Sequence, residues 1–110
     1  MNIAVIGAGP AGLLAAAEAA KAGAAVTLFD KNEKAGKKLY ITGKGRCNVT
    51  NMRPPGEFLE FVVRNRKFLY GAVYSFSPEN TVELIENNGV KTKVERGNRV
   101  FPLSDKASDI

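Results

Sequence analysis

The chain has 110 residues, of which 45% are hydrophobic and 25% are charged, and its formal net charge is +5. These values are typical of one globular domain with a single modest core. The longest nearly apolar stretch, residues 13–20, is interrupted by Glu18 and is far shorter than the roughly 20 residues that span a bilayer, so we expect no membrane contact. No basic residue precedes Lys21, which argues against a secretory signal and predicts a cytoplasmic protein.

Cysteine and histidine are scarce. Cys47 is the only cysteine and histidine is absent, which excludes an internal disulfide bond and argues against a structural zinc site. Residues 31–53 hold seven basic side chains against Glu33 alone. Such a cluster attracts a polyanion such as a pyrophosphate or a nucleic acid, and a solvated basic loop is the alternative. Nucleic acid is disfavoured, because Tyr40 is the only aromatic residue among these charges.

The N-terminal third predicts a strand, a tight turn, a helix and a second strand. Residues 2–6 form a β-rich run that leads into the glycines of residues 7–12, and an alanine-rich stretch follows until Gly23. A second β-branched and aromatic run, residues 26–29, ends at Asp30. The pattern predicts a βαβ unit with two parallel strands and a right-handed crossover.

The middle of the chain predicts a long loop and then two short helices. Residues 31–55 lack apolar periodicity, and we expect a functional loop there with a short extended piece at residues 39–42. Beyond Gly56, helical spacing recurs twice, in Phe58, Leu59, Val62 and Val63 and then in Phe68, Leu69, Ala72 and Val73. The same spacing assigns four aromatic residues mainly to the core rather than to a ligand, namely Phe68, Tyr70, Tyr74 and Phe76.

The C-terminal part predicts one helix and a hairpin. Ser77 is placed as N-cap before Pro78, and Asn88-Gly89 supplies the stop. Residues 90–95 and 99–101 flank Gly97-Asn98 as the strands of a β-hairpin. Residues 102–110 predict a loop that enters another helix, capped by Ser104 or Asp105.

The glycine pattern of residues 7–12 carries the first functional signal. Gly7 permits the turn out of the strand, Gly9 lets backbone N–H groups approach a pyrophosphate, and Gly12 lets helix and strand pack closely. Ala16, one turn later on the same face, is also expected at this contact. A lone pattern of this type is weak, but here it follows a strand and opens a helix, which predicts a dinucleotide site. The alternative is that the glycines serve only turning and packing.

Asp30 strengthens the dinucleotide hypothesis. It lies 18 positions after Gly12, where an acidic residue that accepts hydrogen bonds from the adenosine ribose is expected about 20 residues on. Its charge favours an adenosine without a 2′-phosphate, although Lys31 beside it weakens that discrimination.

Residues 36–51, GKKLYITGKGRCNVTN, resemble the signature of the BaiN-like, or aminoacetone-oxidase-like, NAD(P)/FAD-dependent oxidoreductases. Residues 97–102 and 104–109 resemble a further stretch of that family, so the resemblance covers the whole chain. Similar proteins are much longer and assemble the FAD domain from both ends of the chain around an inserted substrate domain. The resemblance therefore implies that residues 1–110 are the N-terminal segment of an FAD/NAD(P)-binding domain.

The resemblance also implies that residues 42–51 wrap the pyrophosphate and flavin side of FAD. Lys44 departs from the glycine that is common there, which questions a close backbone approach at this position. Arg46 suits either a phosphate or a bracing contact to Asp30 or Glu33. Cys47 is expected to be a packed apolar residue, with a thiol of lowered pKa facing the flavin as the alternative.

The sequence thus predicts an α/β fold in which a Rossmann-like βαβ segment precedes a glycine-rich loop, short helices and a hairpin, as an incomplete domain that self-associates. The expected function is a flavin-dependent oxidoreductase acting on an unidentified small molecule, with FAD as cofactor and NAD(P)H as a candidate electron donor. The alternatives are an NAD-dependent dehydrogenase and an RNA-binding or RNA-modifying flavoprotein. No catalytic residue or metal ligand is assigned. The candidate cofactor-binding residues are Gly7, Gly9, Pro10, Ala11, Gly12, Asp30, Lys31, Lys38, Thr42, Gly43, Gly45, Arg46, Cys47 and Asn48.

Overall fold

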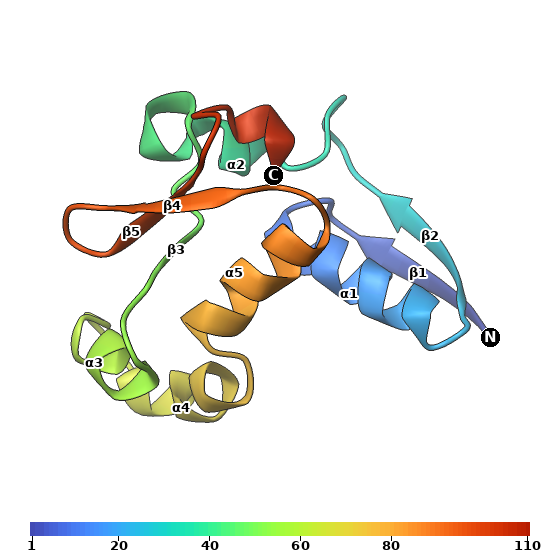
Figure 1. Cartoon of the computed structure of the whole chain (residues 1–110). Helices are drawn as coiled ribbons and strands as arrows, with labels where there is room; N and C mark the ends of the chain where they lie inside the picture. The colour runs from blue at the N-terminus through green and yellow to red at the C-terminus, as the bar shows by residue number, and fades with distance from the viewer.

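The computed structural model describes residues 1–110 and combines a parallel βαβ unit with a small antiparallel sheet and several short helices (Figure 1). The strands are β1 (Asn2–Ile6), β2 (Ala25–Phe29), β3 (Thr50–Asn51), β4 (Thr92–Glu95) and β5 (Arg99–Pro102). The α-helices are α1 (Pro10–Lys21), α2 (Lys37–Ile41), α3 (Pro55–Glu60), α4 (Arg66–Ser75) and α5 (Pro78–Asn87), and two 3₁₀ turns are η1 (Thr42–Gly45) and η2 (Ala107–Asp109). The predicted α/β fold class is confirmed.

The βαβ unit forms where the sequence predicts it. β1 pairs with β2 in parallel, from Asn2 opposite Ala25 to Ile6 opposite Phe29. In both strands, exposed residues alternate with half-buried ones, because α1 packs against one side of the pair. Ile6 and Phe29, at the carboxyl ends of the two strands, are exposed. This end of the sheet is also where α1 begins (Figure 1).

The second sheet holds most of the buried side chains. Its strands are antiparallel in the order β3, β5, β4, and the predicted hairpin is β4–β5. Val100, Phe101 and Pro102 of β5 are buried together with Cys47. The core is nevertheless small, since only 9 of the 110 residues are buried. The radius of gyration of 14.8 Å exceeds the value of about 13 Å for a compact domain of this length.

Helix α5 begins and ends where the sequence predicts. The Ser77 hydroxyl accepts the Asn80 backbone N–H at 3.2 Å, and the Asn80 side chain accepts the Ser77 backbone N–H at 2.9 Å, which completes a capping box. Asn88 is the C-cap, and Gly89 leaves the helix with a φ of 92°. In Figure 1, α5 lies between the βαβ unit and α4.

The prediction of an extended piece at residues 39–42 is wrong, because the chain there forms α2 and then η1. Gly36 enters the helix with a φ of 68°, and its carbonyl accepts the Leu39 backbone N–H at 2.8 Å. The Thr42 hydroxyl donates to the Leu39 carbonyl at 3.0 Å and closes the turn. Flanking glycine and threonine turn chemistry therefore outweighs the β preference of Tyr40 and Ile41.

The cap predicted for the last segment is also wrong. Lys106, rather than Ser104 or Asp105, precedes the short η2 turn. The Ser104 hydroxyl instead accepts the Lys106 backbone N–H at 3.2 Å, and Asp105 adopts a left-handed φ of 59°. Both residues form a tight polar turn of the kind that competes with helix formation.

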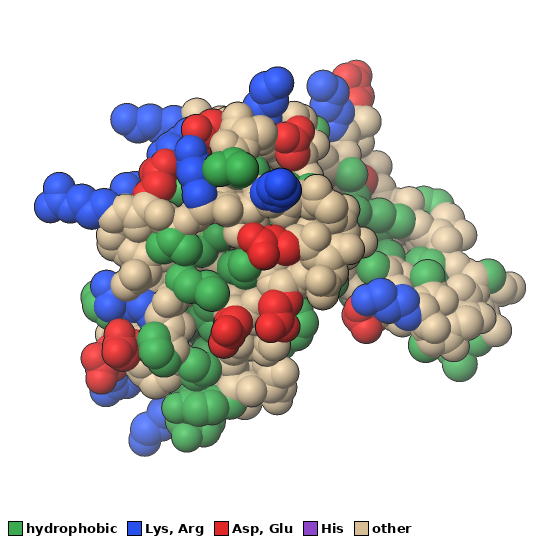
Figure 2. Space-filling model, viewed as in Figure 1, with side chains coloured by type: hydrophobic (Ala, Val, Ile, Leu, Met, Phe, Trp, Pro, Cys, Tyr) green, Lys and Arg blue, Asp and Glu red, His purple; other side chains and the backbone are tan.

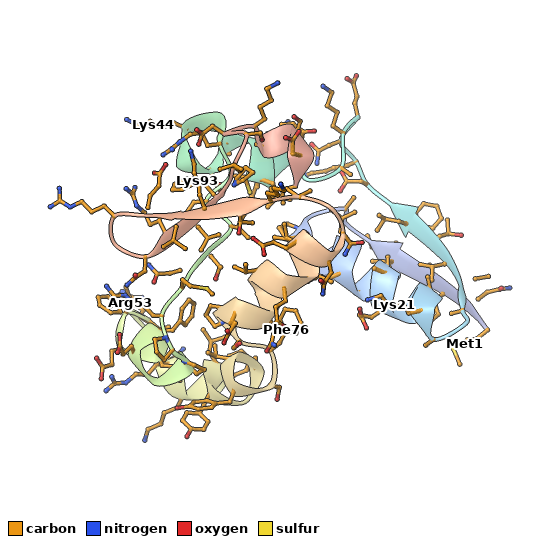
Figure 3. The ribbon with its side chains drawn as sticks, viewed as in Figure 1. Met1, Lys21, Lys44, Arg53, Phe76 and Lys93 are labelled. Atoms are coloured by element: carbon orange, nitrogen blue, oxygen red, sulfur yellow. The ribbon has the colours of Figure 1, made fainter.

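The two predicted helices after Gly56 are present, but the first is shorter than its apolar pattern and the aromatic residues are not core. α3 ends at Glu60, and the following Val63 is exposed. Phe68 has 85% of its surface exposed, and Tyr70, Tyr74 and Phe76 are exposed as well. The reason is that α4 packs mainly on α3, and a single neighbouring helix covers only a narrow stripe of the α4 surface. Figure 3 shows Phe76 at the junction of α4 and α5.

No helix has the length and apolar character needed to cross a bilayer. Hydrophobic side chains nevertheless reach the surface in several places, and Figure 2 shows them interspersed with charged residues on one face.

Replacing Gly12 tests the contact between α1 and β1. A Cβ built at Gly12 lies 1.8 Å from the Gly7 carbonyl oxygen and 3.5 Å from Val5 Cγ1, so even alanine has no room. We expect Gly12→Ala to lower the free energy of unfolding by about 1–3 kcal/mol, the usual cost of overpacking, as measured by urea denaturation. Gly71→Ala is the matched control, since a Cβ there meets nothing within 4 Å and alanine favours the helix. Equal stability of Gly12→Ala and the wild type would contradict this packing.

Candidate functional site

The glycine turn between β1 and α1 forms an open cradle at a helix N-terminus. Gly7 has a φ of 102°, and its N–H donates to the Phe29 carbonyl at 2.7 Å, which ties the turn to the end of β2. Gly9 is the N-cap of α1, and no side chain caps this end of the helix. The first backbone N–H groups of a helix have no partner within it and carry a partial positive charge. The turn therefore offers donors to an anion.

The glycines of this turn have different roles. A Cβ added at Gly9 meets nothing within 4 Å, so the protein itself does not require glycine at this position. A Cβ at Gly12 collides with the Gly7 carbonyl, as described above. Gly12 is thus needed for packing, whereas the space above Gly9 is free for a ligand that approaches the backbone closely. This arrangement fits the pyrophosphate of a dinucleotide, and Pro10 and Ala11 form the same edge of the cradle.

Asp30 stands at the end of β2 and connects three segments. One carboxylate oxygen accepts the Ala8 backbone N–H at 2.6 Å, and the other accepts the Asn32 backbone N–H at 2.6 Å and the Asn32 amide at 2.8 Å. The hydrogen bonds from Asn32, and then the one from Ala8, lower the pKa of Asp30. The carboxylate is therefore ionised at neutral pH and fixed beside the glycine turn. A carboxylate has lone pairs for further donors, so Asp30 can also accept hydrogen bonds from ribose hydroxyl groups.

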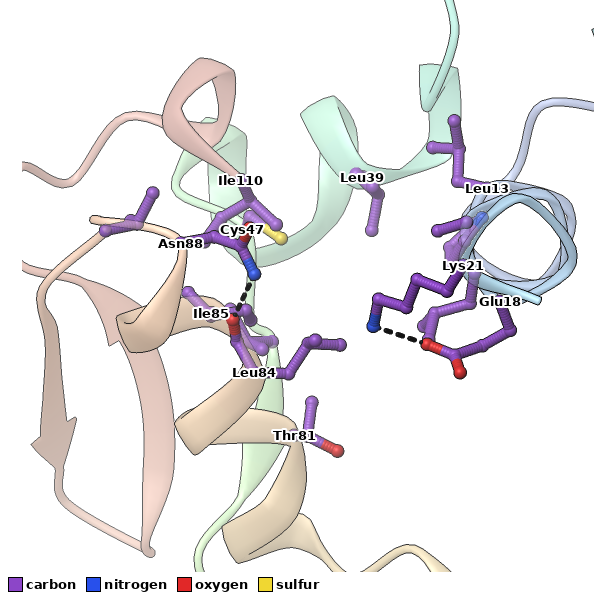
Figure 4. Close-up of a pocket in the computed structure, with 15 residues that line it drawn as sticks. Leu13, Glu18, Lys21, Leu39, Cys47, Thr81, Leu84, Ile85, Asn88 and Ile110 are labelled. Atoms are coloured by element: carbon purple, nitrogen blue, oxygen red, sulfur yellow. Dashed lines mark hydrogen bonds and ion pairs between the residues drawn. The ribbon is translucent and has the colours of Figure 1, made fainter. Parts of the chain in front are cut away.

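The glycine-rich loop lies next to this turn. The Gly36 backbone N–H donates to the Ala8 carbonyl at 2.7 Å. Pro10 and Leu13 of α1 line one groove of about 470 Å³ together with Leu39 and Cys47 of the loop. Figure 4 shows this groove between α1 and α5, with the Cys47 sulfur at its edge. The structure therefore brings the two sequence motifs together.

The loop is seated on Phe101. A Cβ at Gly43 lies 2.7 Å from Phe101 Cε1 and 3.0 Å from the Asn48 backbone nitrogen, so only glycine fits there. Gly43 and Lys44 both adopt left-handed conformations, with φ values of 56° and 58°. Lys44 thus occupies a conformation that glycine favours, which agrees with the glycine that the resemblance leads us to expect at this position. Figure 3 shows the Lys44 side chain pointing away from the ribbon.

Arg46 braces the loop, but not against the residues that the sequence analysis named. Its Nη1 lies 2.9 Å from Glu95 Oε1 and 3.2 Å from Asp105 Oδ1, and its Cζ lies 4.0 Å from the centre of the Phe101 ring. The expected bracing contact to Asp30 or Glu33 is therefore wrong, because Glu95 and Asp105 take that place. The hairpin and the turn after it place these two carboxylates beside the loop, which the sequence spacing does not reveal. A phosphate contact of the guanidinium stays a prediction.

Lys93 completes a four-charge cluster with Arg46, Glu95 and Asp105. Its ammonium lies 2.6 Å from Asp105 Oδ2 and 3.5 Å from Glu95 Oε1. The hydrogen bond from Arg46 lowers the pKa of Glu95, and the one from Lys93 lowers the pKa of Asp105. Both carboxylates are therefore charged at neutral pH, and the cluster joins the loop to the hairpin.

Cys47 is a packed residue. Its exposed fraction is 0%, and burial raises the pKa of its thiol. The expectation of packing is confirmed, and the alternative of a thiol with lowered pKa is wrong, because no positive charge is close enough to outweigh burial. Cys47 also has a φ of 59°, as its chain turns out of η1.

The remaining candidate residues are accessible. Lys31, Lys38, Thr42, Gly45 and Asn48 are exposed. Asn48 makes no side-chain hydrogen bond within the chain, and the Thr42 hydroxyl is used by the Leu39 carbonyl. These positions are compatible with a ligand on the loop, and their contacts to a cofactor stay predictions. Sequence reasoning missed Glu95, Lys93 and Asp105, which carry no local motif.

Comparison with known proteins identifies a family that matches the chain over its whole length. Residues 1–110 match the family described as the HI0933-like protein Rossmann domain. The chain is 37% identical over 87 residues to the ribosomal RNA dihydrouridine synthase of Haemophilus influenzae, covering 78% of this chain and 21% of that protein. It is 37% identical over 118 residues to the 3-dehydro-bile acid delta(4,6)-reductase of Clostridium scindens, covering 99% of this chain and 26% of the relative.

A third relative is the putative oxidoreductase YgfK of Escherichia coli, which is 39% identical over 92 residues, or 79% of this chain and 8% of its own length. The chain thus spans between about a tenth and a quarter of the length of these curated relatives. The resemblance inferred from residues 36–51 is confirmed, and the chain belongs to the HI0933-like Rossmann-domain family.

Proposed function

We propose that this chain binds the ADP part of FAD and is the N-terminal segment of the cofactor domain of a flavin-dependent oxidoreductase. The observation that carries the proposal is the free space above Gly9, at an uncapped helix N-terminus next to an ionised Asp30. A purely structural turn requires glycine where packing is tight, as at Gly12, and does not explain open space at Gly9. An anionic ligand that lies against the backbone does explain it.

Each part of the site has a task in this proposal. The N–H groups at the start of α1 hold the pyrophosphate, and Asp30 accepts the ribose hydroxyl groups. The charge cluster around Arg46 holds the loop on the hairpin, so that exposed Thr42, Gly45 and Asn48 face the cofactor. The flavin supplies hydride chemistry when bound, and the residues of this chain bind and orient it.

The nicotinamide alternative has less support. An NAD-dependent dehydrogenase requires the glycine turn and the acidic residue, but its cofactor does not require the loop that packs on Phe101. The family is one of flavoproteins, and flavin is therefore the cofactor that we propose. NAD(P)H as electron donor, and a cytoplasmic location, stay predictions.

The substrate has two candidate classes. The relatives include a dihydrouridine synthase for ribosomal RNA and a reductase of 3-dehydro-bile acids. Both names describe the addition of hydrogen to a substrate. We therefore propose that the substrate accepts a hydride from the reduced flavin, which is oxidised in that step, and that a separate donor, with NAD(P)H as the candidate, reduces the flavin again. The exposed lysines 31, 34, 37, 38 and 44 supply electrostatic affinity for an RNA, which weakens with salt, although Tyr40 as the only aromatic residue among them disfavours nucleic acid. RNA binding that does not change between low and high salt would remove this candidate.

We also propose that the chain self-associates when it is alone. β1 and β2 form a two-stranded sheet whose outer edges are unpaired, and Ile6 and Phe29 are exposed at one end. Unpaired strand edges and apolar surface both favour association.

Gly9→Val tests the phosphate cradle. We expect FAD binding to be lost, because the branched side chain fills the space through which the pyrophosphate reaches the backbone. We expect the fold to survive, because a Cβ at this position meets nothing within 4 Å and the φ of Gly9 is −78°. Quenching of flavin fluorescence measures binding, and urea denaturation measures the fold. A variant with unchanged FAD affinity would show that the turn has only a structural role.

Asp30→Ala tests the ribose contact. We expect FAD affinity to fall about ten- to a hundredfold, the range for losing hydrogen bonds to a charged acceptor. Glu33→Ala removes the same charge from an exposed position of the same loop and should leave the affinity unchanged. Isothermal titration calorimetry compares the three proteins. If both substitutions weaken binding equally, Asp30 acts only through its charge and makes no specific contact.

A further inference from the structure

A second groove lies between the antiparallel sheet and α3, away from the glycine turn. It has a volume of about 330 Å³ and is lined by Asn51, Arg53, Phe58, Phe61, Val62, Gly97 and Arg99. None of these residues belongs to the glycine turn or to the groove between α1 and α5. Its size is within the range of small-molecule sites. Figure 3 shows Arg53 next to α3.

Asn51 lines this groove and has an unused hydrogen-bond acceptor. Its side-chain nitrogen donates to the Gly97 carbonyl at 2.7 Å, which fixes the orientation of the amide. Its Oδ1 atom is buried and has no hydrogen-bond partner in the chain. Buried polar atoms are nearly always paired, so an orphaned oxygen beside a groove indicates a missing donor.

Two guanidinium groups give the groove its charge. Arg99 forms no ion pair, and its only side-chain hydrogen bond runs from Nε to the Arg96 carbonyl at 3.0 Å. Arg53 has only a weak partner, since its Nη1 lies 3.4 Å from a carboxylate oxygen of the exposed Glu57. Both groups therefore have donors left for an anion, and guanidinium matches carboxylate and phosphate in geometry.

The rest of the lining is apolar and aromatic. Phe61 is exposed, although the Arg53 guanidinium lies 4.3 Å from the centre of its ring. Phe58 and Val62 line the groove beside it. An exposed aromatic side chain next to guanidinium groups with free donors suits a ligand with a flat apolar body.

We propose that this groove binds a small organic anion. Arg53 and Arg99 hold its carboxylate or phosphate, Phe58 and Phe61 contact its flat body, and a ligand N–H or O–H donates to Asn51 Oδ1. The inference does not rest on the proposed flavin function, because the groove shares no residue with the glycine turn, although Asn51 is the last residue of the segment 42–51 that the resemblance assigns to FAD.

The test is a calorimetric titration of the protein with 4-hydroxybenzoate, benzoate and phenyl phosphate. We expect 4-hydroxybenzoate to bind more tightly than benzoate, because only its hydroxyl can donate to Asn51. This advantage should disappear in Asn51→Leu. Arg99→Gln should weaken binding about tenfold, the effect of losing a charged hydrogen bond. Arg96→Gln is the matched control, since it removes the same charge from an exposed residue outside the groove.

The three probes distinguish the chemical classes of ligand. Tighter binding of benzoate than of phenyl phosphate assigns the groove to a carboxylate, and the reverse order assigns it to a phosphate. The proposal is overturned if no probe binds, if Arg96→Gln and Arg99→Gln lose the same affinity, or if FAD displaces the probe. If Asn51→Leu does not fold, the comparison of the two benzoates on the wild type decides, and equal affinities overturn the contact with Asn51. Unchanged probe binding in Gly9→Val, beside lost FAD binding, shows that the two sites are independent.

Discussion

The close approach of α1 to the end of β1 is the constraint on which the candidate site depends. With no side chain at Gly12, the helix backbone lies against the Gly7 carbonyl, where a Cβ would come within 1.8 Å. This contact directs the N-terminus of α1 to the carboxyl ends of both parallel strands, which is where ligands bind in open α/β sheets. Asp30 reinforces the arrangement, because its carboxylate accepts the Ala8 N–H from across the turn at 2.6 Å.

The loop is fixed by a different set of forces. Phe101 is 1% exposed and packs against Gly43, while Arg46 stacks on its ring and pairs with Glu95 and Asp105. The loop therefore belongs to the hairpin as much as to the βαβ unit. A single hydrogen bond of 2.7 Å from Gly36 to Ala8 then joins it to the glycine turn. Because the hairpin fixes the loop and a hydrogen bond joins the loop to the glycine turn, a chain with few buried residues still brings the two motifs side by side.

Local signals predicted most of the fold, and contacts between distant segments were not predictable. The βαβ unit, the capped helix after Ser77 and the hairpin each have a cap, a turn or a strand pattern in the sequence. The partners of Arg46 lie 49 and 59 residues further along the chain, and no spacing rule connects them. Phe68 and Tyr70 were assigned to the core because helical periodicity shows a stripe but not whether anything covers it. The turn at Gly36 likewise overrode the β preference of the residues that follow.

The most direct test of the phosphate cradle is the response of its backbone amides to a ligand. The ¹⁵N-labelled protein is titrated with ADP, which carries the ribose and pyrophosphate of the proposed cofactor, and two-dimensional NMR spectra are recorded. The account predicts that the largest shift changes occur at the amides of Gly9, Ala11 and Gly12, with a smaller change at Asp30. Shift changes confined to the lysine-rich residues 31–38, with the amides at the start of α1 unaffected, would contradict it.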